Sequence, residues 1–245
     1  FQEFVLTGIH VASYGKDLNN VNLLSLIEDI SKIEGVERIR LGSLEPTLLT
    51  EDFVKAIKDM PKVCRHYHLS LQSGHDETLK RMNRKYNTKQ YREIVDRLRK
   101  YIPDVAITTD IMVGFPGETQ EEFEATREFV KSIRFSRIHV FKYSPREGTP
   151  AARYKDQVPE NIKEIRSREL IALGKEMEIE YLRGFVGKEE LVLFEEESKD
   201  KKGWYEGYTD HYIRVAVQYN DSLIGNIVPV KLGKIEDGVM LGILK

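Results

Sequence analysis

Residues 105–119 read VAITTDIMVGFPGET. The first nine residues of this stretch are mostly apolar or β-branched, which predicts a buried strand over 105–113. The segment GFPGET then supplies two glycines and a proline, which end the strand and form a turn. Apolar residues at helical spacing follow over about 119–132. A strand, a tight turn and a helix in this order form the unit from which parallel α/β sheets are built.

The same unit recurs on both sides of this stretch. Further strands are predicted at 3–9, 36–42, 66–72 and 136–143, and further helices at 22–33, 50–59 (with Thr50 as N-cap), 75–82, 88–101 and 159–183. Four of the five strands are followed by a helix before the next strand, which indicates parallel βαβ units. We therefore expect the α/β fold class, as a partial, open TIM-type barrel whose site lies at the carboxyl ends of its strands.

The pattern changes after Gly184. Residues 185–245 contain short strand-like segments separated by glycines and no helical period, which predicts a small antiparallel β-barrel of the OB or TRAM type. We expect two domains, 1–184 and 185–245. Several residues of the second domain are of the types that stack on single-stranded RNA or pack in a core: Trp204, Tyr205, Tyr208, Tyr212 and Arg214. The domain holds 8 Lys and Arg against 11 Asp and Glu, and this acidic balance disfavours general RNA binding.

Composition sets further bounds. The 245 residues carry a net charge of −2, so no global basic field attracts nucleic acid. The one cysteine, Cys64, cannot form a disulfide within the chain or hold an iron–sulfur cluster by itself, and a small buried apolar role is favoured for it. No apolar run reaches the length of a membrane span. We expect a cytoplasmic protein, and the start at Phe1 indicates a piece of a longer chain.

Small, polar or glycine residues follow each predicted strand. Because parallel strands present their following loops on one face, these residues are expected to converge on one pocket. The other interpretation is that glycine and proline merely end the strands. The candidates are Ser43, Glu45, Ser70, Gln72 and Asp110, together with Gly114, Phe115, Pro116 and Gly117 of the turn. For Glu118, we favour a structural role in the first helical turn.

Two other groups of polar residues are weaker candidates for a functional site. The basic stretch 80–86, which includes Arg84, either meets a ligand carboxylate or phosphate or is a solvated helix end. His66 and His68 share a face of one predicted strand, and no third ligand accompanies them. We interpret them as hydrogen-bonded strand histidines and expect no metal site in this chain.

In combination, these motifs resemble the methylthiotransferase family of radical S-adenosylmethionine (SAM) enzymes. The resemblance rests on VLTGIHVASYG (5–15), RIRLGSLEP (38–46), HLSLQSGHDETLKRMNRKY (68–86), TTDIMVGFPGETQEEF (108–123) and HVFKYSPREGTPAA (139–152). The tail resembles the TRAM domain of the family. The segment TGIH (7–10) is most similar to the branch that acts on tRNA carrying N6-threonylcarbamoyladenosine beside the anticodon.

The resemblance implies a set of cofactor contacts. It places Gly114 to Glu118 along the adenine of SAM, and Ser70, Gln72 and Asp110 near its ribose and methionine. It also places Ser43 and Glu45 near the methionyl amine or the substrate, and it pairs Arg84 with the SAM carboxylate.

The resemblance further implies cofactors, a partner and a reaction. Members of the family use SAM and two 4Fe–4S clusters, and the branch most similar to this chain 2-methylthiolates N6-threonylcarbamoyladenosine in the anticodon stem-loop of tRNA. The cysteines of both clusters are missing here. This implies a fragment that begins at the second barrel strand and is inactive alone.

Two alternatives stay open, namely a ribosomal protein S12 methylthiotransferase and a non-catalytic RNA-binding module. A hydrolase on a TIM barrel is disfavoured because no acid–base pair or metal triad is evident. An incomplete barrel exposes a strand edge, so dimers or other self-association are expected.

Overall fold

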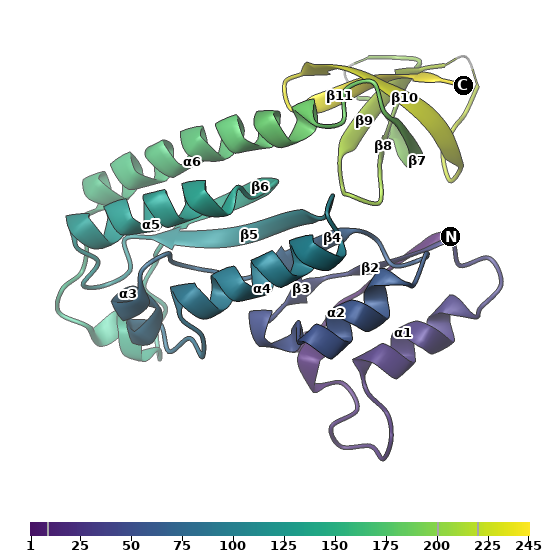
Figure 1. Cartoon of the computed structure of the whole chain (residues 1–245). Helices are drawn as coiled ribbons and strands as arrows, with labels where there is room; N and C mark the ends of the chain where they lie inside the picture. The colour runs from purple at the N-terminus through teal and green to yellow at the C-terminus, as the bar shows by residue number, and fades with distance from the viewer. Residues whose placement is uncertain (9, 200, 220) are drawn as a thin grey trace.

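The computed structural model describes residues 1–8, 10–199, 201–219 and 221–245. Ile9, at the end of the first predicted strand, lies outside these residues. The first part of the chain forms parallel strands in the order β1-β2 and β3-β4-β5-β6 (Figure 1). Their bounds are β1 (Glu3–Leu6), β2 (Arg38–Leu41), β3 (Ser43–Leu44), β4 (His66–Leu69), β5 (Ala106–Val113) and β6 (Arg137–Lys142). The prediction of parallel βα units is confirmed.

The strand predicted over 36–42 is interrupted at Gly42. The Gly42 N–H donates to the Leu6 carbonyl oxygen of β1 at 2.8 Å, and the chain then turns to pair Ser43 and Leu44 with β4. Ile39 of β2 donates to the Lys62 carbonyl oxygen and accepts from the Cys64 N–H just before β4. The two groups of strands therefore form one continuous layer.

The helices of the described chain lie near their predicted positions. Their bounds are α1 (Leu23–Ser31), α2 (Glu51–Lys58), α3 (Asp76–Arg81), α4 (Thr88–Tyr101), α5 (Gln120–Ile133) and α6 (Glu160–Arg183). Thr50 caps α2 by accepting from the Phe53 N–H, as its position predicted. Asn87 and Thr119 begin α4 and α5 with capping boxes.

The sheet has one apolar and one polar face because side chains alternate along each strand. Residues such as Leu69 and Ile107 pack with Leu98 and Phe123 of the helices in the main core. The opposite face carries Arg40, His66, His68, Thr108 and Asp110. Thr108 Oγ1 contacts both His66 Nε2 and His68 Nδ1 at 3.0 Å. Both histidines are therefore hydrogen-bonded strand residues, as the sequence predicted.

In the described residues after α6, five strands form a closed barrel in the order β10-β11-β9-β8-β7. Their bounds are β7 (Glu189–Glu197), β8 (Trp204–Tyr208), β9 (Arg214–Gln218), β10 (Ile227–Glu236) and β11 (Val239–Leu244). The predicted small β-barrel is confirmed, and its strand pairings are antiparallel except for that of β9 with β11, which is parallel. A closed ring with an odd number of strands cannot alternate in direction all the way round, so at least one pairing must be parallel.

The small barrel has its own core and lies at the amino ends of the parallel strands. Leu182 and Phe185 pack with Val215, Val230 and Met240 in a cluster separate from the main core. In Figure 1 this barrel follows the end of α6, on the same side of the molecule as the N-terminus. In the described part of the chain, no helix is long and apolar enough to cross a membrane.

Candidate functional site

A pocket of about 240 Å³ lies at the carboxyl ends of β1, β3 and β4. It brings together four of the predicted site residues, namely Ser43, Glu45, Ser70 and Arg84. Ser43 begins the short strand β3 and Glu45 follows it, Ser70 follows β4, and Arg84 comes from the basic stretch after α3. Residues from separate segments of the sequence thus share one cavity because their strands are parallel neighbours.

Glu45 is held in place by a neighbouring histidine. Its carboxylate accepts a hydrogen bond from His10 Nε2 at 2.7 Å, and the second ring nitrogen of His10 lies 2.5 Å from Ser13 Oγ. His10 also lines the pocket. The contacts with Ser13 and Glu45 fix the orientation of the His10 imidazole. The Glu45 carboxylate oxygens still have lone pairs that can accept a hydrogen bond from a ligand.

Tyr86 also lines the pocket and was not predicted as a site residue. Its buried hydroxyl donates to the carbonyl oxygens of Ser70 at 2.5 Å and Leu71 at 3.1 Å. Burial raises the pKa of Tyr86 to about 12, so the phenol stays a neutral donor. This contact fixes the backbone after β4. In the sequence, Tyr86 lies at the end of the basic stretch 80–86. An aromatic residue at that position gives no reason to expect hydrogen bonds to the backbone after β4.

Gln72 and Asp110 lie beside the pocket but do not line it. The Gln72 N–H donates to the Asp110 carbonyl oxygen, and the Gln72 carbonyl oxygen accepts from the Met112 N–H, both at 2.9 Å. Gln72 has a φ of 71°, which is unfavourable for a residue with a side chain and often marks a functional segment. His68 Nε2 lies 3.4 Å from Asp110 Oδ2, and this interaction lowers the pKa of Asp110.

The GFPGE turn lies outside the lining of this pocket. Phe115 is buried edge-to-face against Tyr143, with ring centroids 5.2 Å apart. Gly114 has a φ of 71°, and a Cβ atom there would lie 2.3 Å from Lys163 Cγ of α6. Close packing of α6 against the turn therefore requires this glycine. The expectation that all five strand ends share one pocket is not met, because this cavity gathers residues from the first three.

Glu118 has a structural role, but not in the position that the sequence suggested. Its buried carboxylate accepts from the Gly114 N–H at 2.9 Å and from Arg166 of α6 at 2.6 Å. Burial raises the pKa of Glu118 against the opposing effect of these donors. The residue precedes Thr119, the N-cap of α5, so the prediction of a first-turn position is wrong.

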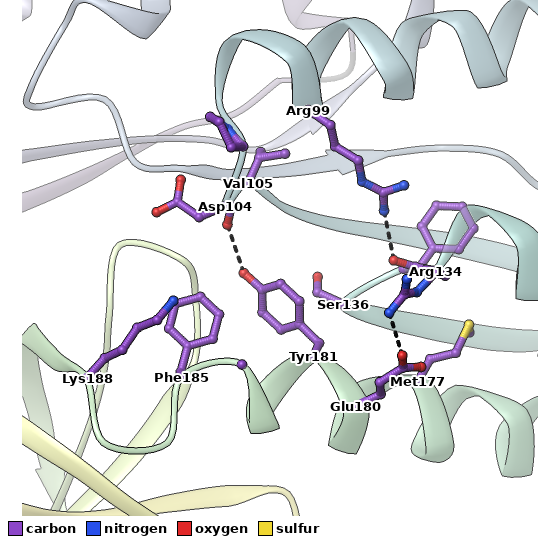
Figure 2. Close-up of a pocket in the computed structure, with 13 residues that line it drawn as sticks. Arg99, Asp104, Val105, Arg134, Ser136, Met177, Glu180, Tyr181, Phe185 and Lys188 are labelled. Carbon is purple, nitrogen blue, oxygen red and sulfur yellow. Dashed lines mark hydrogen bonds and ion pairs between the residues drawn. The ribbon is translucent and has the colours of Figure 1, made fainter.

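A larger pocket of about 460 Å³ lies near the amino ends of the strands, between the end of α6 and the loop after α4. Figure 2 shows that several of its polar groups bond to one another. Tyr181 donates to the Asp104 carbonyl oxygen at 3.2 Å, Arg99 donates to the Arg134 carbonyl oxygen at 2.8 Å, and Arg134 pairs with Glu180. Since these groups already pair with one another, we take the smaller pocket, at the carboxyl ends of the strands, as the candidate site.

Two of the small barrel's aromatic residues do not form an open stacking surface. Tyr205 is buried in the small core. The Tyr212 ring stacks on His66 of β4, with centroids 4.9 Å apart, and Arg40 of β2 lies 4.8 Å from its centre. The hypothesis of RNA stacking is wrong for Tyr205, because its ring is buried, whereas Tyr212 is 43% exposed beside its contacts with His66 and Arg40.

Cys64 does not supply a reactive thiol. The residue is buried just before β4, and burial raises its pKa to about 12. A thiolate is needed to bind iron or to act as a nucleophile. The predicted packing role is consistent with this environment.

Comparison with known proteins gives one family match. Residues 3–130 match the model of the Radical SAM superfamily. This range includes all residues of the pocket and the GFPGE turn.

Sequence relatives extend the likeness through the small barrel. The threonylcarbamoyladenosine tRNA methylthiotransferase MtaB of Bacillus subtilis is 40% identical over 96% of this chain and 52% of its own length. The MtaB protein of Thermotoga maritima is 40% identical over 98% of this chain and 54% of its own length. The tRNA-2-methylthio-N(6)-dimethylallyladenosine synthase of Clostridium tetani is 42% identical over 96% of this chain and 52% of its own length. The chain thus spans about half the length of these curated relatives.

A solved structure supports the fold alone. Coproporphyrinogen III oxidase (HemN) from Escherichia coli superposes with a TM-score of 0.55 at 17% identity, over 72% of this chain and 40% of that chain.

Proposed function

Because this chain belongs to the radical SAM superfamily, we propose that it is the part of a tRNA methylthiotransferase that holds the SAM pocket and the small β-barrel. The observation that carries the proposal is the extent of the likeness to such enzymes, which runs through both the parallel sheet and the small barrel. The substrate we propose is N6-threonylcarbamoyladenosine in the anticodon stem-loop of tRNA. The product is its 2-methylthio derivative.

The cavity suits the amino-acid end of SAM. Glu45 offers a carboxylate for the methionyl amine, and Arg84 offers a guanidinium for the methionyl carboxylate. Among the described residues, the Arg84 side chain has no hydrogen-bonding or ion-pair partner, so its charge is available. Ser43 and Ser70 add hydroxyls to the same wall.

The remaining contacts lie along the neighbouring strands. We assign the ribose and the rest of the methionine to Gln72 and Asp110. The backbone from Gly114 to Gly117 faces the adenine. In the intact protein, one SAM molecule would be the source of a radical and a second SAM molecule the source of the methyl group.

The residues present do not fit a 4Fe–4S cluster. Cluster binding needs several cysteine thiolates, and this chain has one cysteine, with a buried thiol of raised pKa. We therefore propose that the two clusters are held by residues outside this chain. The 245 residues alone bind SAM weakly and are inactive.

The activity test uses the intact protein, reconstituted with iron and sulfide under anaerobic conditions and incubated with SAM, a reductant and tRNA. Nucleoside analysis by mass spectrometry should detect the 2-methylthio derivative of N6-threonylcarbamoyladenosine. The relative from Clostridium tetani makes N6-dimethylallyladenosine the second candidate substrate, and tRNA carrying each modification is assayed in parallel. Modification of ribosomal protein S12, or RNA binding with no methylthiolation, would overturn the proposal.

The pocket is tested by titrating SAM into the intact protein. Arg84→Ala and Asp110→Ala should each weaken SAM binding about 10-fold or more, because each removes a charge-assisted contact. Lys85→Ala is the matched control, since Lys85 is exposed, bonds to Asn83 and does not line the pocket. Unchanged affinity in both test variants would overturn the assignment.

We also propose that the 245-residue chain self-associates through β1. Phe4 and Val5 are exposed on this strand, and its described pairing is with β2 alone. Light scattering should detect dimers or larger species, and Val5→Lys should reduce them. A wild-type chain that stays monomeric at high concentration would contradict this.

A further inference from the structure

We propose that Glu190, Asp210 and His211 form a binding site for a divalent transition-metal ion, of which Zn²⁺ is the best fit, between the small barrel and the parallel sheet. One ligand atom from each residue lies within 4.8 Å of the others. Glu190 lies on β7, and the other two residues lie on the β8–β9 connection. The sequence predicted no metal site, because these residues are separated by 20 positions and match no ligand motif.

The distances between the ligand atoms suit a tetrahedral ion. His211 Nδ1 lies 3.0 Å from Asp210 Oδ1 and 3.8 Å from Glu190 Oε2. With metal–ligand bonds of about 2.0–2.2 Å, tetrahedral ligands lie roughly 3.3–3.6 Å apart. Small rotations of the two carboxylates bring all three atoms into this range, and water can fill a fourth position.

The state of His211 is the independent observation that indicates a ligand. Its side chain is fully buried, and in the described structure Nδ1 has no hydrogen-bond partner despite the nearby carboxylates. Nε2 lies 3.2 Å from Asp104 Oδ2, on the other side of the ring. When Nε2 donates to Asp104, Nδ1 is left with a lone pair, which is the arrangement of metal-bound histidines.

The local charge also favours a dication. Three carboxylates converge on His211, from Asp104, Glu190 and Asp210, and Arg65 supplies a compensating positive charge by donating to Asp210 Oδ2 at 2.8 Å. With a neutral imidazole, these four charged groups leave two net negative charges. A bound Zn²⁺ would neutralise them.

The surroundings partly shield the site from solvent. The Phe185 ring packs edge-to-face on His211, with centroids 4.9 Å apart, and limits access of water. The three ligands come from the small barrel. Asp104, which follows α4, and Arg65, which precedes β4, bond to His211 and Asp210 and hold these two ligands in place.

The test measures Zn²⁺ binding to the 245-residue chain by competition with a chromophoric chelator. We expect one tight equivalent, and Co²⁺ in the same position should give the visible absorption of a tetrahedral complex. Glu190→Gln should weaken binding by at least about 100-fold, because it removes a charged ligand while keeping the side-chain shape. Glu206→Gln is the matched control, since Glu206 also lies on the small barrel but pairs with Arg214.

A second variant, Asp210→Asn, separates ligand loss from misfolding when its circular dichroism spectrum is compared with that of the wild type. A folded Asp210→Asn protein that loses the Co²⁺ absorption supports the site. Absence of Zn²⁺ binding by the wild type, or equal affinity in the wild type and Glu190→Gln, would overturn it. The second result would mean that His211 is held between carboxylates as an imidazolium.

Discussion

The two ends of the parallel sheet use their polar side chains differently. At the amino ends, Arg38, Arg40 and Arg65 bond to backbone and carboxylate groups of the small barrel. At the carboxyl ends, Arg84 and Glu45 line an open pocket, and Arg84 has no partner among the described residues. The first set holds the small barrel against the parallel sheet, and the second set is left available for a ligand.

Burial explains why the two ends should respond differently to mutation. Arg40 is 4% exposed and its partner Glu3 has 10% of its side chain exposed. Removal of one member of such a pair leaves an uncompensated buried charge. Arg84 is exposed, so water replaces any contact that a mutation removes.

The largest effect on stability is expected for Arg40→Met. This change leaves Glu3 without the guanidinium at 2.7 Å and the Thr209 carbonyl oxygen without its 3.1 Å donor. Urea unfolding should show a loss of about 3–5 kcal/mol in the free energy of unfolding. Arg214→Met, which breaks an exposed pair with Glu206, should cost about 0.2–1 kcal/mol. Similar losses in the two variants would remove the contrast between the buried and exposed pairs.

The next effect is a pH dependence from His66 at the amino end. Burial lowers the pKa of His66 to about 3, from about 6.5 in the unfolded chain. Below pH 6.5 the unfolded chain binds a proton that the folded chain does not, so stability is lost as the pH falls toward 3. The contribution approaches about 1.4 kcal/mol per pH unit within this window.

The measurement compares urea unfolding of the wild type with that of His66→Gln, whose amide can keep the bond to Thr108. The variant should have the shallower dependence between pH 6.5 and 3. Parallel pH profiles would show that His66 is protonated equally in the folded and unfolded states.

A smaller effect is expected at the carboxyl end for Gly114→Ala. The new Cβ meets Lys163 Cγ and the backbone φ of 71° is unfavourable, so thermal unfolding should report a loss of about 1–3 kcal/mol. Gly148→Ala is the control, because Gly148 also has a positive φ (83°) but has no atom within 4 Å of the added Cβ. It should cost about 1 kcal/mol. Equal losses would mean that packing against α6 does not require the glycine.

The smallest effect on stability is expected for Arg84→Ala in the pocket. The free energy of unfolding should change by about 0.5 kcal/mol or less, because the side chain is exposed and unpaired among the described residues. Urea unfolding beside Lys85→Ala provides the comparison. A loss of more than about 1 kcal/mol would place Arg84 among the structural residues of the fold rather than in a ligand site.

The sequence by itself determined the parallel βα units, the helix positions and the change to a small β-barrel after Gly184. These features depend on local periodicity, on caps such as Thr50 and on turn residues, which act over a few positions. It also determined that Ser43, Glu45 and Ser70 lie at the same end of the sheet, because parallel strands share one direction.

Only the tertiary structure decided how distant residues meet. The parallel β9–β11 pairing follows from ring closure, and the stacking of Tyr212 on His66 follows from the docking of one domain on another. Glu190 likewise contacts His211 from a distant segment, and Tyr86 donates a hydrogen bond to the backbone after β4. No local pattern encodes such contacts, because they depend on which surfaces remain to be buried after each element has formed.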